Sequence, residues 1–171
     1  MKFTKEDARK RVLNCTKQYQ QNLLHKKLLI IFRERQDNSI RFIEVIFHER
    51  NYQHLTGLEL TNTEGKILQH QSKNFYRKCI ENKLGLNDVD KVMGGVNFCL
   101  GLSRENDVFI PSSALLEDIK KLTSSPSQVL AIFEKDIDSE LYSTVKHIAK
   151  GLNLHHLILP PEINSKILLP K

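Results

Sequence analysis

The chain has 171 residues, of which 40% are hydrophobic and 27% are charged, and its formal net charge is +6. This composition is typical of a soluble globular protein, because the longest apolar run (28–32) is too short to cross a membrane and no apolar signal core follows the first methionine. The three cysteines are scattered and lack the spacing of a zinc site, so we expect a cytoplasmic protein that binds no membrane, metal or cofactor.

Residues 4–25 are predicted to form a helix. Thr4 and Asp7 have the spacing of an acidic capping box, which marks the helix start. Apolar residues then recur at helical spacing, and this stripe is predicted to pack on a sheet. The stripe consists of Ala8, Val12, Cys15, Tyr19 and Leu23.

Positive charge is concentrated in the same part of the chain. Residues 1–35 carry ten lysines and arginines and only three acids, which gives +7, while the remaining residues sum to −1. Such a patch attracts phosphates or an acidic partner, although a solubilising surface without a ligand explains it equally well. The residues predicted to bind nucleic acid or a partner are Arg9, Lys10, Arg11 and Lys17.

An antiparallel hairpin is predicted next. Residues 26–35 and 40–49 are rich in Ile, Phe and Val, and the turn-forming "QDNS" separates them. Residues 72–84 are then predicted to form a helix that places Phe75, Cys79 and Ile80 on one face.

The second half of the chain is predicted to alternate strands and helices. Two strands (96–102 and 108–110) precede Pro111, which is expected to end the second one. A short helix over 112–122 is followed by a buried strand over 128–135. Residues 138–152 fit a helix, although their alternation leaves a strand open.

A short strand and a proline-stiffened tail are expected over 154–163. We therefore predict an α+β fold in which an N-terminal helix packs on a largely antiparallel sheet. Its single domain would consist of a basic helix (1–26), a sheet-containing core (27–160) and a tail (161–171).

No familiar catalytic motif is present. The sequence lacks a phosphate-binding loop, GxGxxG, HExxH and GxSxG. The remaining His, Lys, Arg and Tyr residues suit RNA cleavage without a metal. In that reaction a base takes the ribose 2′-OH proton, a cation stabilises the phosphorane, and an acid protonates the leaving 5′-oxygen.

The stretch "VIFHERNYQHLTGL" (45–58), followed by "FYRKC" (75–79), resembles a family found in phages and prophages of Gram-positive bacteria. This family is the fourth phage-associated class grouped with the barnase–EndoU–colicin–RelE-like nucleases. The resemblance runs from about Lys2 to Glu162, and "HLTG" is its specific part. It implies N-terminal helical elements on an antiparallel sheet and a nuclease role in a bacterial host cell.

His54 is the main catalytic candidate, because the unperturbed pKa of histidine lies near 6.5. The alternative is that His54 fixes a turn by bonding a backbone carbonyl. We predict that "NYQHLTG" is a strand-end turn whose path Gly57 permits, and that His54 faces a cleft opposite Tyr142 or Lys146. Tyr142 and Lys146 are the other two residues predicted to be catalytic, and they would share one face of either a helix or a strand.

Four further residues are predicted to bind substrate: Asn51, Thr56, Arg77 and Lys78. A Thr before a Gly more often fixes a turn, and the two cations also fit a solvated helix face.

The sequence favours two functions. The first is a metal-independent ribonuclease, acting by 2′-OH attack as a toxin or against the host. The second is a non-enzymatic phage protein that inhibits a host defence ribonucleoprotein, as an anti-CRISPR does. The expected partners are RNA or a ribonucleoprotein, together with a host defence nuclease or an antitoxin. The enzyme is favoured only slightly, because no acid–base pair is marked by spacing.

Overall fold

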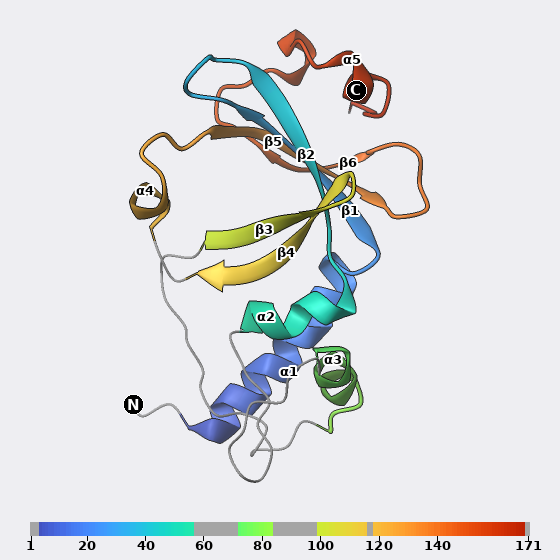
Figure 1. The fold of residues 1–171 in the computed structure, drawn as a ribbon. Helices are drawn as coiled ribbons and strands as arrows, with labels where there is room; N and C mark the ends of the chain where they lie inside the picture. The colour runs from blue at the N-terminus through green and yellow to red at the C-terminus, as the bar shows by residue number, and fades with distance from the viewer. Residues whose placement is uncertain (1–3, 57–71, 84–98, 116–117, 170–171) are drawn as a thin grey trace. The chain divides into compact units, whose positions relative to one another are not determined.

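The computed structural model describes residues 4–56, 72–83, 99–115 and 118–169. In this part of the chain it confirms the predicted α+β class (Figure 1). In chain order the elements are α1 (Lys5–Asn22), β1 (Lys26–Arg33), β2 (Ile40–Ile46), η1 (Glu49–Asn51), α2 (Tyr52–Thr56), α3 (Ser72–Ile80), β3 (Cys99–Glu105), β4 (Val108–Leu115), α4 (Ile119–Leu122), β5 (Gln128–Asp136), β6 (Thr144–Ile148), η3 (Leu154–His156) and α5 (Pro161–Asn164). The strands follow the order β3-β4-β2-β1-β5-β6 in a mostly antiparallel mixed sheet.

The residues group into two compact units, each assembled from separate segments of the chain. The first unit draws its described residues from Met1–Leu24, Phe47–Ser103 and Ile110–Glu117. The second unit draws them from His25–Ile46, Arg104–Phe109 and Asp118–Lys171. Each unit has its own core, and the single domain that we expected stays a prediction.

In the first unit, α1 begins where the sequence predicts. Thr4 Oγ1 accepts a hydrogen bond from the Asp7 backbone N–H at 3.1 Å, and the Asp7 carboxylate accepts one from the Thr4 backbone N–H at 3.0 Å. This reciprocal pair satisfies backbone donors that a helix start leaves without partners.

The buried stripe of α1 differs from the predicted one at two positions. Ala8, Val12 and Tyr19 are buried as expected, but Cys15 is exposed and Leu23 is only half-buried. Thr16 and Leu24 are buried instead. An apolar pattern does not include Thr16, because threonine is polar. Its buried hydroxyl is satisfied by contacts of 2.8 Å with the Val12 carbonyl and 2.9 Å with the Tyr52 hydroxyl.

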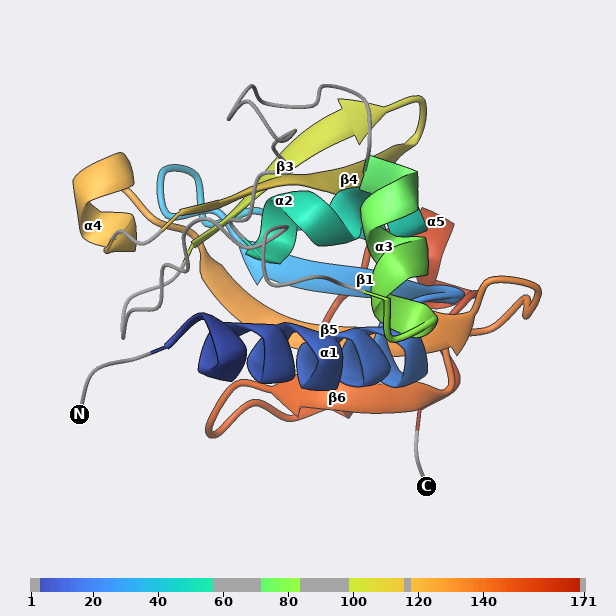
Figure 2. The same cartoon turned by 90° about the horizontal axis from the view of Figure 1, so that it is seen from below.

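Aromatic side chains form the core of the first unit, where α2 and α3 lie beside α1 (Figure 2). Their ring centroids are 4.9 to 6.3 Å apart. Edge-on and tilted contacts at such distances stabilise a core beyond simple burial. The five rings belong to Tyr19, Phe47, Tyr52, Phe75 and Tyr76.

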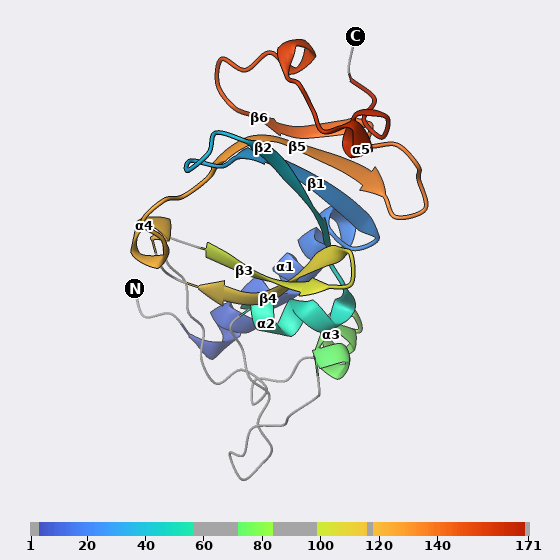
Figure 3. The same cartoon turned by 45° about the horizontal axis from the view of Figure 1, so that its top comes forward.

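The predicted hairpin lies at the centre of the second unit and is confirmed. β1 pairs antiparallel with β2, from Lys27 opposite Ile46 to Arg33 opposite Ile40, and with β5 on its other side. η3 and α5 belong to the C-terminal segment, which covers one side of these strands (Figure 3). The core residues are Leu29, Ile31, Leu130, Ala131, Phe133, Tyr142, Leu154 and Ile163.

Two predictions around Pro111 are wrong. β4 continues through Pro111 to Leu115, and the predicted helix over 112–122 shrinks to α4 (Ile119–Leu122). The described pairing of β4 with β2 is Val45 opposite Phe109, so the missing N–H of Pro111 does not interrupt it.

Predictions near the C-terminus also need correction. The helix favoured over 138–152 is instead the strand β6, which pairs with β5 and leaves its other edge without a strand partner in the sheet order. The strand expected over 154–163 is replaced by η3 and α5. Within the expected tail, Ile163 is fully buried and belongs to the core of the second unit.

Candidate functional site

The predicted strand-end turn around His54 is helical. η1 leads directly into α2, and Asn51 joins the two. The Asn51 side chain accepts a hydrogen bond from the His48 backbone N–H at 2.9 Å and donates one to the Pro111 carbonyl at 2.8 Å. Asn51 is only 4% exposed. Its amide is therefore committed to holding this segment, rather than open to the substrate that we predicted.

α2 buries one side and presents His54 on the other. Tyr52 and Gln53 are buried, whereas His54 is exposed. The Tyr52 hydroxyl donates to the Val12 carbonyl at 2.8 Å, which anchors the inner side of α2 to α1. His54 is therefore available to a ligand.

The Thr56 hydroxyl donates to the Gln53 carbonyl at 2.7 Å. This bond fits the alternative in which Thr56 fixes the local backbone. Gly57 and the bend that we predicted for it lie outside the described residues.

Tyr142 lies in the core of the second unit. It is fully buried, and its hydroxyl donates to Glu44 Oε1 at 2.6 Å. Burial, together with the Glu44 carboxylate, raises the pKa of Tyr142 well above its ordinary value. The Lys135 ammonium lies 5.2 Å from the ring centroid. A hydroxyl held in this way supports the fold and does not suit proton transfer to a substrate.

Glu44 joins Tyr142 to a second partner. Glu44 Oε2 lies 2.9 Å from the Lys27 ammonium. Burial alone would raise the pKa of Glu44, but the hydrogen bonds from Tyr142 and Lys27 outweigh it and lower the pKa.

Lys146 reaches a different carboxylate. Its ammonium lies 3.0 Å from Glu134 Oε2, an ion pair whose geometry does not make a hydrogen bond. Glu134 lies opposite Leu28 on β1, whereas Glu44 lies opposite Leu29. Neighbouring residues of a strand point to opposite faces, so these carboxylates project from opposite faces of the sheet. The structure therefore does not bring Tyr142 and Lys146 together, although the sequence predicted a shared face.

The basic residues predicted on α1 divide into two kinds. Arg9 donates to the backbone and side-chain oxygens of Asn82, both at 3.3 Å, and so ties α1 to the end of α3. Lys10 and Lys17 are exposed and line a groove of about 430 Å³, whose other walls include Cys79 and Asn82. Arg11 is exposed on the same helix.

The cations predicted on α3 lie near a second hollow. Arg77 is exposed and lines a cavity of about 420 Å³ together with Lys73, Glu49 and Tyr76, while Lys78 is half-buried. Sequence reasoning missed Lys73 and Tyr76, although Tyr76 belongs to the "FYRKC" motif. The Tyr76 hydroxyl is buried and has no hydrogen-bond partner among the described residues. Burial and the nearby Glu49 carboxylate raise the pKa of Tyr76.

The residues that the structure describes contain neither a metal-binding cluster nor a membrane-spanning helix. Among them, no group of three or more His, Cys, Asp and Glu side chains is arranged to hold a metal ion. No helix within the same residues is long and apolar enough to span a membrane.

Comparison with known families matches residues 11–95 to a class of phage-type, nuclease-like proteins. The particular family is phage-Barnase-EndoU-ColicinE5/D-RelE like nuclease 4, and the matched residues include both "HLTG" and "FYRKC". The resemblance inferred from these motifs is confirmed over this stretch, which is just under half of the chain. The extension to Glu162 that we expected goes beyond the matched residues. No curated protein and no solved structure matches the chain.

Proposed function

We propose that this protein is a metal-independent ribonuclease of a phage or mobile element, and that His54 is its general acid or base. One observation carries the proposal. The histidine of the matched motif is the exposed side chain of α2, while its neighbours Tyr52 and Gln53 are buried. A fold that anchors one side of a short helix and leaves a histidine on the other provides a rigid mount for proton transfer.

Lys10 and Lys17 supply the binding charge in this proposal. The Lys17 side chain makes no ion pair or hydrogen bond with the residues that the structure describes, and the Lys10 ammonium lies 4.0 Å from Glu6 Oε1, the limit of an ion pair. Exposed lysines along a groove attract the phosphates of a nucleic acid without reading its bases. Lys73 and Arg77 lie at the hollow beside α3 in the same unit, where Glu49 and Glu81 balance their charge, so the binding charge is assigned to the groove on α1.

The proposed chemistry needs no bound ion. A base removes the proton of the ribose 2′-OH, the 2′-oxygen attacks the adjacent phosphorus, and the bond to the 5′-oxygen breaks as an acid protonates it. The products carry a 2′,3′-cyclic phosphate and a 5′-hydroxyl. Tyr142 has a supporting part here, since its hydroxyl is held by Glu44.

A cleavage assay with a matched histidine pair tests this assignment. His54→Ala should slow cleavage of labelled RNA in EDTA by about 10²-fold or more, as expected on losing a general acid or base. Its melting temperature should stay the same because His54 is exposed. His155→Ala, which removes an exposed histidine of the second unit, should leave cleavage unchanged.

Equal cleavage by the two variants would refute the role of His54. If the wild-type protein binds RNA but never cleaves it, the inhibitor of a host defence ribonucleoprotein becomes the better proposal.

A further inference from the structure

The tip of the central hairpin, in the second unit, contains a hollow of about 400 Å³. Two arginines line it: Arg33, which ends β1, and Arg35, which lies two residues further along in the turn to β2. Arg33 lies opposite Gln128 of β5, and Gln128 lines the same hollow. The remaining lining residues are Glu34, Asn38 and Pro126.

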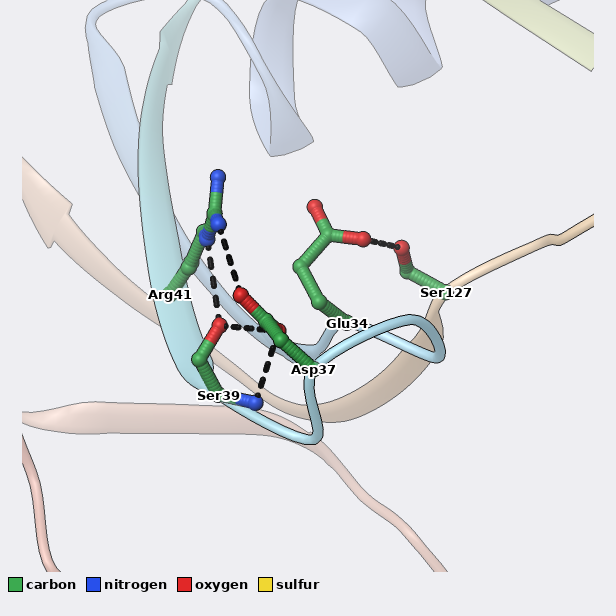
Figure 4. Close-up of polar contacts among 5 residues, drawn as sticks. All are labelled: Glu34, Asp37, Ser39, Arg41 and Ser127. Atoms are coloured by element: carbon green, nitrogen blue, oxygen red, sulfur yellow. Dashed lines mark hydrogen bonds and ion pairs between the residues drawn. The ribbon is translucent and has the colours of Figure 1, made fainter.

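The acids of the turn are engaged by other groups (Figure 4). Glu34 Oε2 accepts a hydrogen bond from the Ser127 hydroxyl at 2.7 Å. Asp37 accepts hydrogen bonds from the Ser39 hydroxyl at 2.6 Å, the Ser39 backbone N–H at 3.0 Å and the Arg41 guanidinium at 3.0 Å. The bonds from Ser39, reinforced by Arg41, lower the pKa of Asp37 to about 2. Arg41 therefore balances the Asp37 charge.

Arg33 and Arg35 have no such partner. Neither guanidinium group makes a hydrogen bond or ion pair with the residues that the structure describes. Glu34 also lines the hollow, and its hydrogen bond from the neutral Ser127 hydroxyl leaves its negative charge in place. One carboxylate offsets only one of the two guanidinium charges, so the hollow keeps a net positive charge that attracts an anion. Arginine suits phosphate in particular, because its planar fork donates two parallel hydrogen bonds to one phosphate group.

We propose that this hollow binds the phosphates of a single-stranded RNA, as a second contact separate from the groove on α1. The proposal rests on the proposed function for its choice of RNA over other polyanions. Under this proposal, Arg33 and Arg35 of the second unit bind RNA phosphates and take no part in cleavage.

A binding assay with RNA that cannot be cleaved tests this site apart from catalysis. The probe is a fluorescent single-stranded oligonucleotide in which every 2′-OH is replaced by 2′-O-methyl. Its affinity is measured by anisotropy over a range of salt concentrations. For Arg33→Gln/Arg35→Gln, the slope of log affinity against log salt should fall by about 1.4, since each phosphate contact contributes about 0.7 for single strands.

The control removes the same charge from the same unit. Lys26→Gln/Arg41→Gln also deletes two cations, but both are paired, with Asp136 and Asp37. The slope of log affinity against log salt should change less than half as much in this control as in the arginine variant. Urea unfolding of both variants checks that the second unit is intact.

Three results would overturn the proposal. Equal slope changes in the two variants would show that only net charge matters, and an unchanged slope in the arginine variant would show that the hollow binds no phosphate. If the arginine variant loses affinity for polyglutamate but keeps its affinity for RNA, the hollow serves an acidic protein. Absence of cleavage by a wild-type protein that binds the probe would refute the proposed function alone.

Discussion

At the scale of single residues, Tyr52 and Tyr76 are buried tyrosines of the first unit whose hydroxyls are in opposite situations. The Tyr52 hydroxyl donates to the Val12 carbonyl and lies beside the Thr16 hydroxyl. The Tyr76 hydroxyl has no hydrogen-bond partner in the described part of the chain. A buried hydrogen bond contributes modest net stability, whereas a buried polar group without a partner costs free energy.

These two tyrosines therefore predict opposite outcomes for the same substitution. Tyr52→Phe should lower the free energy of unfolding by about 0.5–1.5 kcal/mol, the usual net value of one hydrogen bond. Tyr76→Phe should leave it unchanged or raise it. Urea unfolding of the two variants measures the difference. A greater loss of unfolding free energy for Tyr76→Phe than for Tyr52→Phe would contradict this and mean that the Tyr76 hydroxyl makes a hydrogen bond.

Glu44 gives a prediction about pH. Its pKa is lower in the folded protein than the ordinary glutamate value, so the unfolded chain binds the proton more readily. The stability that Glu44 contributes is thus fully present at pH values above the ordinary glutamate pKa. It is lost as the pH falls through the lower pKa that Glu44 has in the folded protein. Glu44→Gln should be less stable than the wild type at pH 7, and the gap should shrink on acidification. Urea unfolding at several pH values measures this difference. A difference in the free energy of unfolding that stays constant with pH would contradict the prediction.

At the scale of elements, the C-terminal segment behaves as part of the core. Ile163 is fully buried and packs with Leu29, Phe133 and Tyr142, whereas Ile158 in the same segment is 87% exposed. Ile163→Ala should cost about 2–5 kcal/mol, the usual range for a buried large-to-small change, and Ile158→Ala should cost almost nothing. Thermal or urea unfolding measures the loss of stability in each variant. Similar losses for Ile163→Ala and Ile158→Ala would mean that the segment does not pack on the core.

Elements with local signals could be predicted from the sequence. The capping box fixed the start of α1, and the apolar runs around "QDNS" fixed the hairpin. β6 has weaker local signals, because four of its five residues are exposed and only its pairing with β5 decides between strand and helix. The segment after β6 escaped prediction for a related reason. Its helices are single turns held by packing of Leu154 and Ile163 on strands far away in the sequence.

The candidate site shows the same division between local and distant information. The exposure of His54 follows from its place on a short helix, although the helix itself was mistaken for a turn. The separation of Tyr142 from Lys146 depends on the register of β1 with β2 and β5, because that register sets the faces of Glu44 and Glu134. Spacing along one segment carries no information about such a register.

At the scale of the whole molecule, the N-terminal excess of positive charge is shared between the two units. Lys10 and Lys17 belong to α1 in the first unit, whereas Arg33 and Arg35 belong to the hairpin of the second. We predict that Lys10→Gln/Lys17→Gln lowers the salt slope of RNA binding by about 1.4, because two phosphate contacts are lost. Salt titrations of the variant and the wild type measure this, and an unchanged slope would mean that the groove lysines only solubilise the protein.

We propose that the protein cleaves RNA through the 2′-hydroxyl without a metal. The most direct measurement compares an RNA oligonucleotide with its 2′-O-methyl counterpart, each incubated with the wild-type protein in EDTA, and identifies the product ends by mass spectrometry. We predict cleavage of the RNA alone, with a 2′,3′-cyclic phosphate on one product and a 5′-hydroxyl on the other. Intact RNA, or cleavage of both oligonucleotides, would contradict it.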